Sequence, residues 1–176
     1  MRIFVTGATG FIGYNLVKEL EKKKIKTLAF ARKIENVNQK KFKYVKFISL
    51  DIYKQKKIFK IFGTPKILIH LAWEGLPNYQ KNFHIKKNLP NDLAFLKRAI
   101  DNDVKQLIIS GTCYEYGKQE GCLNENLKTI PYTKYAKAKD ILRLKLEKIR
   151  IKKPFILQWV RIFYPFGNYQ NSKSLL

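Results

Sequence analysis

The sequence predicts an α/β protein built on a doubly wound parallel sheet with helices on both faces. Three observations support this prediction. Strand-like and helix-like segments alternate along the chain, the first strand runs into a glycine-rich turn, and 45% of the 176 residues are hydrophobic. Such alternation favours parallel strands joined by crossover helices. Since this length suits one domain with a sizeable core, we expect residues 1–176 to form a single domain.

The first strand, turn and helix are the most informative part of the chain. The apolar run from Ile3 to Val5 predicts a buried strand. Glycines follow at Gly7, Gly10 and Gly13, and a helix is indicated by apolar residues at helical spacing, namely Ile12, Leu16, Val17 and Leu20. A strand, a glycine turn and a helix in this order are typical of the phosphate-binding start of a Rossmann-type fold. The spacing is G-x-x-G-x-x-G, and a glycine turn that binds nothing is the alternative.

Each glycine has an expected role in this turn. Gly7 allows the chain to turn sharply off the strand. Gly10 has no Cβ, so that the backbone can approach a pyrophosphate bound to the free N–H groups of the helix start. Gly13 allows the helix to pack closely against the sheet. We therefore expect residues 1–176 to be an NAD(P)-binding Rossmann domain.

The remaining elements follow in a regular order. Further strands are expected at residues 26–31, 44–50, 67–71, 106–110 and 155–163. Helical segments are expected at residues 58–62, 92–100 and 135–149. Because ligands of an open parallel sheet bind beyond the carboxyl ends of its strands, we expect the site to be built there.

The end of the second expected strand bears on the choice of cofactor. In many NAD-binding proteins an acidic residue at this place binds the adenosine ribose. Here Ala31 is followed by Arg32 and Lys33. A guanidinium pairs well with a 2′-phosphate, which favours NADP over NAD. The alternative is that Arg32 is simply another surface cation.

Tyr135 and Lys139 are the candidate catalytic pair. They lie four residues apart at the start of an expected helix, hence on one face. A free tyrosine, with a pKa of about 10, is a poor acid–base catalyst at neutral pH, and a nearby ammonium lowers that pKa. Thr112, at the end of the fifth expected strand, could orient a substrate carbonyl by a hydrogen bond. A chance occurrence of Tyr-x-x-x-Lys is the alternative in a chain rich in both residues.

The charge of +23 is unusual and comes mostly from lysine. The lysines are spread along expected helices and loops, whereas nucleic-acid binding often uses clustered arginines and aromatic residues. We therefore expect a solvated basic surface and no specific nucleic-acid partner. No apolar run reaches membrane-spanning length, and Cys113 and Cys122 form neither a metal pattern nor a disulfide framework. These features predict a cytoplasmic protein with no metal site and no membrane partner.

Together these motifs resemble those of the extended short-chain dehydrogenase/reductase family, which includes NAD-dependent nucleotide-sugar epimerases, dehydratases and reductases. The matching segments follow the family order over nearly the whole chain. They are Thr6 to Gly13, Asp51-Ile52, His70 to Ala72, Asn88, Ser110 to Gly117, Tyr135 to Lys139 and Arg161 to Gly167.

The resemblance implies specific roles for these residues. Tyr135 would donate or accept the proton, Lys139 would hold the cofactor ribose and tune Tyr135, and Thr112 would orient the sugar. The implied cofactor-binding residues are Gly7, Thr9, Gly10, Phe11, Ile12, Gly13, Arg32, Asp51, Ile52, Leu71, Ala72, Trp73, Asn88, Tyr135, Lys139 and Phe163.

Some of these positions have simpler interpretations. Asp51 could only cap a helix, Asn88 could be a loop residue before Pro90, and Phe163 could be core. His70, at the end of a buried strand, is interpreted as a satisfied core histidine.

Within the family, residues 70–79 and 111–117 are most similar to reductases of nucleotide-linked 4-keto-6-deoxyhexoses. This similarity implies a dTDP-linked substrate and a role in surface polysaccharide biosynthesis. It also allows the protein to be a homodimer. The chain departs from the family in three ways. Tyr14 stands at a usually small position, Pro90 should interrupt the helix through Asn88, and the chain stops at Leu176, without most of the usual small C-terminal substrate domain.

Two alternative functions stay open because of these departures. The first is an inactive truncated remnant that binds cofactor only. The second, favoured only by the charge, is a dinucleotide-sensing or nucleic-acid-binding module.

Overall fold

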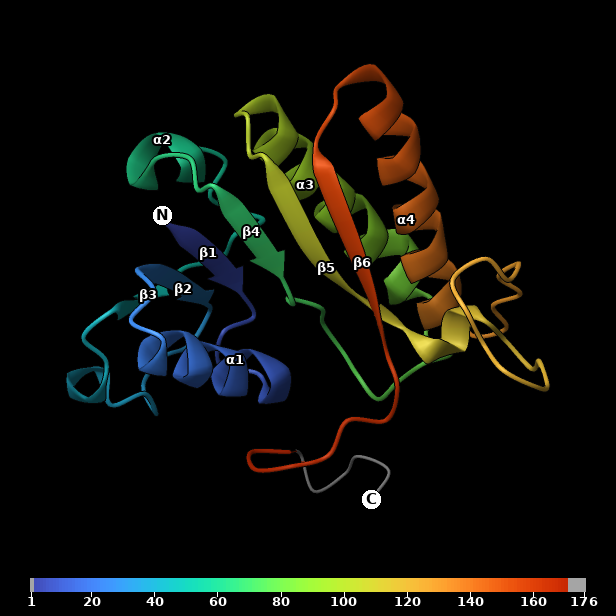
Figure 1. The fold of residues 1–176 in the computed structure, drawn as a ribbon, viewed down its shortest axis with the longest axis horizontal. Helices are drawn as coiled ribbons and strands as arrows, with labels where there is room; N and C mark the ends of the chain where they lie inside the picture. Colours follow the sequence, from blue (N-terminus) through green and yellow to red (C-terminus); the bar gives the residue numbers. More distant parts are fainter. Residues whose placement is uncertain (1, 171–176) are drawn as a thin grey trace.

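The computed structural model describes residues 2–170, which form one parallel six-stranded sheet (Figure 1). The strand order is β3-β2-β1-β4-β5-β6, and every neighbouring pair is parallel. The strands are β1 (Ile3–Thr6), β2 (Thr27–Ala31), β3 (Val45–Ser49), β4 (Ile67–His70), β5 (Gln106–Thr112) and β6 (Ile156–Ile162). The order reverses between β1 and β4, which creates a crevice at the carboxyl ends of these two strands. The doubly wound parallel sheet predicted from the sequence is confirmed.

Helices cover both faces of the sheet, as predicted. The α-helices are α1 (Phe11–Lys22), α2 (Ile58–Phe62), α3 (Leu89–Asp101) and α4 (Lys134–Lys152). Side chains of β1 alternate between the faces, as the period of a strand requires. Ile3 and Val5 lie in the same apolar cluster as Val17 of α1, whereas Phe4 lies with Phe95 of α3 and the buried residues of α2 and α4. Figure 1 shows α1 on one side of the sheet and α3 and α4 on the other.

Short helical turns complete the described chain. They are the 3₁₀ turns η1 (Gln39–Lys41) and η3 (Cys113–Glu115) and the π-helical turn η2 (His84–Asn88). The expectation that Pro90 interrupts the helix through Asn88 is wrong, because η2 runs directly into α3 with Pro90 in the first turn of that helix. A proline is tolerated there because the N–H groups of a first turn have no partner within the helix.

One part of the sheet lies beyond the cover of α1. In β6, Ile156 and Val160 have 58% and 46% of their surfaces exposed. Since β6 forms the edge of the described sheet, its apolar residues on this face gain little from burial. The described core is therefore centred on β1, β2, β4 and β5.

Candidate active site

The glycine turn has the geometry that phosphate binding requires. Gly7 has a φ of 68°, and a Cβ there would lie 2.8 Å from the backbone N of Ala72. A Cβ on Gly13 would lie 2.1 Å from the carbonyl O of Gly7. Helix α1 begins after Gly10 with no side-chain cap and no acidic residue in its first turn. The free N–H groups at the start of this helix are therefore suited to an anion such as a dinucleotide pyrophosphate.

Two cavities lie at the carboxyl ends of the strands, on either side of this turn. The Arg32 cavity has a volume of about 620 Å³, and the Tyr135 cavity one of about 480 Å³. The cofactor-binding residues predicted from the sequence that line the Arg32 cavity are Gly7, Thr9, Gly10, Arg32, Asp51, Ile52, Leu71, Ala72 and Trp73. Those that line the Tyr135 cavity are Gly7, Gly10, Phe11, Ile12, Gly13, Leu71, Trp73 and Tyr135, together with Thr112. The shared residues make the two cavities halves of one elongated site.

The far end of the Arg32 cavity contains paired charges. Nη1 of Arg32 lies 3.3 Å from Oε1 of Glu74, and Nζ of Lys87 lies 3.0 Å from Oε2 of the same residue. The Asp51 carboxylate accepts a hydrogen bond from the backbone N–H of Tyr53 at 2.9 Å. Asp51 thus caps a turn, as its simpler interpretation proposed, and also lines the cavity.

Tyr135 and Thr112 meet in the Tyr135 cavity. Tyr135 follows the N-cap Thr133, whose hydroxyl accepts a hydrogen bond from the N–H of Ala136 at 3.0 Å. Burial raises the pKa of Tyr135, Glu115 raises it further, and a hydrogen bond with Thr112 lowers it. The expectation that Lys139 would lower this pKa overall is not met, because desolvation is the largest effect. The tyrosine is therefore protonated at neutral pH, as a proton donor to a carbonyl requires.

Lys139 lies one helical turn from Tyr135 and is fully buried. Its Nζ lies 4.0 Å from the ring centroid of Trp73 and has no hydrogen-bond partner among the described residues. Burial lowers the pKa of Lys139 to about 8. Lys139 lines neither cavity itself, but Trp73, beside it, lines both. An unpartnered buried ammonium next to a glycine-lined cavity fits a cofactor that carries hydroxyl groups.

Glu115 forms a buried cluster that the sequence analysis did not single out. Its carboxylate accepts hydrogen bonds from the N–H of Thr112 at 2.8 Å, from Nε1 of Trp159 and, at 3.0 Å, from Nε of Arg161. These contacts fix Thr112 and join the ends of β5 and β6. The position of Glu115 directly after a buried strand is the sequence signal that could have indicated this cluster. A buried carboxylate needs a cation beside it, and Arg161 is that cation.

Besides Lys139, two residues predicted to bind the cofactor line neither cavity. Phe163 is 49% exposed, and its ring lies 6.0 Å from that of Tyr116. It lines neither cavity, and it is not a core residue either. Asn88 is buried and donates a hydrogen bond of 2.8 Å to the carbonyl O of Glu74. Asn88 lines neither cavity, and its hydrogen bond supports the segment between β4 and η2.

His70 and Tyr14 are accounted for by packing. Nδ1 of His70 lies 2.8 Å from the hydroxyl of Thr6, and Nε2 lies 3.3 Å from Oδ1 of the buried Asp92. His70 is a core residue, as interpreted, but its Nε2 has no hydrogen-bond partner among the described residues. Tyr14 packs against Phe42 and Tyr169 and lines neither cavity.

The rest of the Tyr135 cavity is aromatic and uncharged. Tyr79, Tyr114 and Tyr164 line it, with Tyr79 and Tyr114 in edge contact at 5.3 Å. No acidic, basic or histidine side chain is among its described lining residues. The sequence analysis missed this cage because its residues come from three separate segments after β4, β5 and β6.

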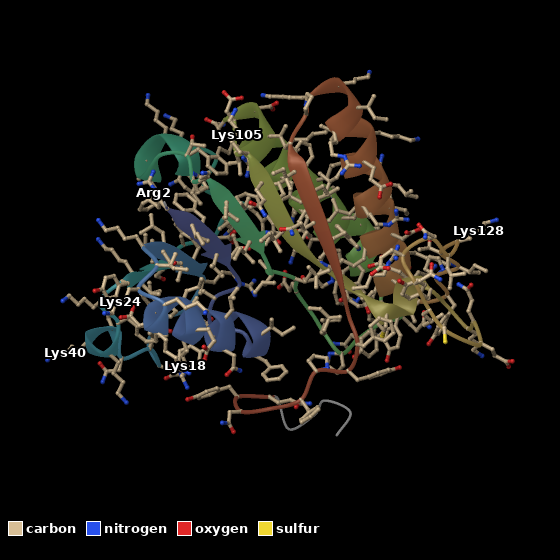
Figure 2. The ribbon with its side chains drawn as sticks, in the orientation of Figure 1. Arg2, Lys18, Lys24, Lys40, Lys105 and Lys128 are labelled. Atoms are coloured by element: carbon tan, nitrogen blue, oxygen red, sulfur yellow. The ribbon has the colours of Figure 1, made fainter. Side chains whose placement is uncertain are left out.

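The basic side chains surround the molecule. Figure 2 shows Arg2, Lys24, Lys40, Lys105 and Lys128 pointing outward from different sides of the fold. This distribution supports a solvated surface, although it does not test nucleic-acid binding. In the described part of the chain, no helix is long and apolar enough to cross a membrane.

The fold is of the dinucleotide-binding Rossmann type, and Tyr135 and Thr112 lie together in a cavity beside its glycine turn. The sequence profile of the NAD dependent epimerase/dehydratase family matches residues 3–175. The chain belongs to this family.

The chain is also similar to individual proteins and solved structures. The chain is 29% identical over 178 residues to the dTDP-6-deoxy-L-talose 4-dehydrogenase (NAD(+)) of Aggregatibacter actinomycetemcomitans, covering 99% of this chain and 65% of that protein. The fold is similar to that of the UDP-N-acetylglucosamine 4-epimerase of Methanobrevibacter ruminantium, with a TM-score of 0.84, 24% identity and coverage of 98% of this chain and 58% of that one. For the UDP-glucuronic acid 4-epimerase of Bacillus cereus in complex with NAD, the corresponding values are 0.80, 23%, 97% and 59%. The chain therefore spans about two thirds or less of the length of these relatives.

Proposed function

We propose that this site belongs to an NAD(P)-dependent reductase of a nucleotide-linked 4-keto-6-deoxyhexose. The observation that carries the proposal is the pairing of Tyr135 with Thr112 in a cavity that adjoins the glycine turn. A reduced nicotinamide dinucleotide, when bound, would supply the hydride to the carbonyl carbon. Thr112 orients the sugar oxygen by a hydrogen bond, and Tyr135 gives that oxygen its proton. Lys139 beneath them stabilises the phenolate that remains.

The uncharged cage supports a sugar without a carboxylate. A uronic acid placed in the Tyr135 cavity would bury its charge without a cation among the described lining residues, which is costly. A methyl group at C6 would instead contact the aromatic faces of Tyr79 and Tyr114. The relative from A. actinomycetemcomitans is named for a dTDP-linked 6-deoxyhexose, which also supports this substrate class.

The test is to follow NAD(P)H consumption with dTDP-4-keto-6-deoxyglucose, and with a nucleotide-linked 4-keto uronic acid as the matched control. We expect oxidation of the dinucleotide with the deoxy sugar and none with the uronic acid. Faster turnover of the uronic acid would contradict the proposal. Tight cofactor binding without turnover of either sugar would favour the alternative of an inactive, cofactor-binding protein.

The preference for NADP over NAD stays a prediction. The cofactors seen or named in the relatives are NAD, and Arg32 pairs with Glu74 at 3.3 Å. We nevertheless expect NADPH to bind more tightly than NADH. Arg32→Ala should lower the ratio of the two affinities about tenfold, because a charge-assisted hydrogen bond contributes about 1.5 kcal/mol or more. Fluorescence titration of both cofactors measures the ratio, with Lys33→Ala as the matched control. An unchanged ratio in Arg32→Ala would show that Arg32 is only a surface cation.

The charge of +23 gives a separate prediction about nucleic acid. A dispersed lysine surface should bind DNA weakly, without sequence preference, and with an affinity that falls steeply as salt is added. Anisotropy with two unrelated duplexes over a range of salt concentrations measures both properties. Selective binding at physiological salt would instead support a nucleic-acid-binding module.

A further inference from the structure

His84 is a fully buried histidine to which the proposed reaction assigns no role. It is the first residue of η2. Nε1 of Trp73 donates a hydrogen bond of 3.0 Å to Nδ1 of His84, and Nδ2 of Asn88 lies 3.4 Å from the same nitrogen. Nε2 of His84 lies 3.0 Å from the carbonyl O of Asn78. Both ring nitrogens therefore have partners.

These partners determine the tautomer of His84. An indole N–H can only donate, so Nδ1 must accept, and a carbonyl O can only accept, so Nε2 must carry the proton. The ring is therefore neutral. In the imidazolium form, Nδ1 would carry a proton directed at the N–H groups of Trp73 and Asn88. The hydrogen bond from Trp73 would then be lost and buried donors left unpaired.

Trp73 connects His84 to the catalytic residues. Its ring lies 4.0 Å from Nζ of Lys139 and lines both cavities. The centroid distance between the rings of Trp73 and Tyr135 is 5.7 Å. Nζ of Lys139 has no hydrogen-bond partner among the described residues, so the place of this ammonium depends on the ring of Trp73.

The segment after β4 depends on the same histidine. The hydrogen bond from His84 to Asn78 precedes Tyr79, whose carbonyl O accepts a hydrogen bond of 3.0 Å from the N–H of Tyr135. This N–H belongs to the first turn of α4, where backbone donors have no partner within the helix. His84 thus supports the start of the catalytic helix as well as the indole beside it.

We propose that His84 is a positioning residue whose neutral ring holds the Trp73 indole in contact with Lys139. Through that contact it sets the place of the ammonium near Tyr135. This inference rests on the proposed function of the site. His84 itself lines neither cavity, so it acts through Trp73.

The surroundings of His84 favour the neutral ring. Burial lowers the pKa of His84 below its ordinary value of 6.5, the hydrogen bond to Asn78 opposes this effect, and the charge of Lys139 adds to it. The remaining titratable group that α4 places nearby is Tyr135, with its ring 5.4 Å from that of His84.

Other charged groups around η2 are directed elsewhere. On α3, which also packs against η2, Asp92 lies 3.3 Å from Nε2 of His70. On η2 itself, Lys86 is exposed and Lys87 is paired with Glu74 at 3.0 Å. Neither of these two carboxylates is paired with His84, so neither stabilises its charged form.

The first measurement is ¹⁵N NMR of the imidazole rings in the protein without cofactor or sugar. The chain has two histidines, so the variants His84→Gln and His70→Gln assign the two sets of signals. We expect His84 to be protonated at Nε2 only, and the indole N–H signal of Trp73 to shift together with His84 as the pH is lowered. Protonation at Nδ1, or a Trp73 signal that does not follow His84, would overturn the inference.

The second measurement is a calorimetric titration of NAD⁺ as a function of pH. NAD⁺ is the probe because, unlike NADP⁺, it carries no phosphate monoester with a pKa of about 6. Protonation of His84 releases Trp73 and displaces Lys139. The affinity should therefore fall as the pH is lowered through the pKa of His84, approaching about tenfold for each further pH unit.

His84→Gln is the conservative variant, because an amide can accept from Trp73 and donate to Asn78 but does not titrate. It should bind NAD⁺ about as tightly as the parent at neutral pH and lose the fall on acidification. His84→Phe can make neither hydrogen bond and should bind about tenfold more weakly. His70→Gln, the matched control at the other histidine, should keep the fall.

A fall in affinity that persists in His84→Gln would overturn the inference. If His84→Gln does not fold, as judged by thermal unfolding, the NMR measurement on the parent decides between the two tautomers. Neither measurement uses a sugar. The inference can therefore fail while the proposed reductase activity holds, or hold in a protein that turns over no sugar.

Discussion

Replacing Tyr135 with Phe should reduce turnover of the keto sugar by about 10²- to 10⁴-fold, the usual contribution of a positioned general acid. The variant removes only the hydroxyl. The ring contacts of Tyr135 with Trp73, Tyr79 and His84, at centroid distances of 5.7, 5.8 and 5.4 Å, are retained. We therefore expect cofactor affinity and thermal stability close to those of the parent. Steady-state kinetics of NAD(P)H oxidation, combined with a cofactor titration, separates the two properties.

Tyr132→Phe is the matched control for this change. Tyr132 is 47% exposed and lines neither cavity, so the loss of its hydroxyl should leave the rate unchanged. Equal rates for parent and Tyr135→Phe would exclude Tyr135 as the proton donor. A fall in cofactor affinity with an unchanged rate constant would instead assign Tyr135 to binding.

Replacing Gly13 with Ala should greatly weaken cofactor binding and destabilise the protein. The new Cβ would lie 2.1 Å from the carbonyl O of Gly7 and 2.9 Å from Cα of Ala8, and both are backbone atoms. The clash can be relieved only by moving the glycine turn or the start of α1, and overpacking of this kind costs about 1–3 kcal/mol. Moving the turn would also displace the N–H groups that face the phosphates. We expect at least a hundredfold weaker binding of the dinucleotide by calorimetry, together with a lower Tm.

Gly121→Ala separates destabilisation from lost binding. Gly121 has a φ of 86°, and a Cβ there meets no atom within 4 Å. The strain of a left-handed alanine should cost about 1 kcal/mol. Since Gly121 lines neither cavity, cofactor affinity should be unchanged. If Gly13→Ala bound the dinucleotide as tightly as Gly121→Ala does, the glycine turn would not be the phosphate site.

These expectations concern residues 1–176, and the relatives that the chain matches are longer. Catalysis draws on binding energy from parts of a substrate remote from the reacting atoms, here the nucleotide. We therefore expect the polypeptide of residues 1–176 assayed alone to bind cofactor more readily than it turns over a sugar. The comparison of Tyr135→Phe with its parent remains informative at low rates, because it measures a ratio.

The sequence by itself determined the order of the elements and the glycine turn. Periodicity in Ile3 to Val5 and in α1 is a local property. So are the positive φ of Gly7 and the close approach of Gly10 and Gly13 to the carbonyl O of Gly7, although a Cβ on Gly7 would also meet Ala72 of a distant segment. The spacing of Tyr135 and Lys139 along one helix is equally local. These features could be predicted because each depends on neighbours in the chain.

The tertiary structure decided what surrounds these residues. The strand order brings β4 beside β5, and α4, which contacts β5, carries Lys139 to Trp73, the residue that follows β4 by a short segment. Burial then outweighs the expected effect of Lys139 on the pKa of Tyr135, because desolvation depends on the whole packed core. The Glu115 cluster, the aromatic cage and the buried Asp92 likewise join residues from separate elements. The periodicity of the sequence does not predict such contacts, because the residues that form them lie far apart in the sequence.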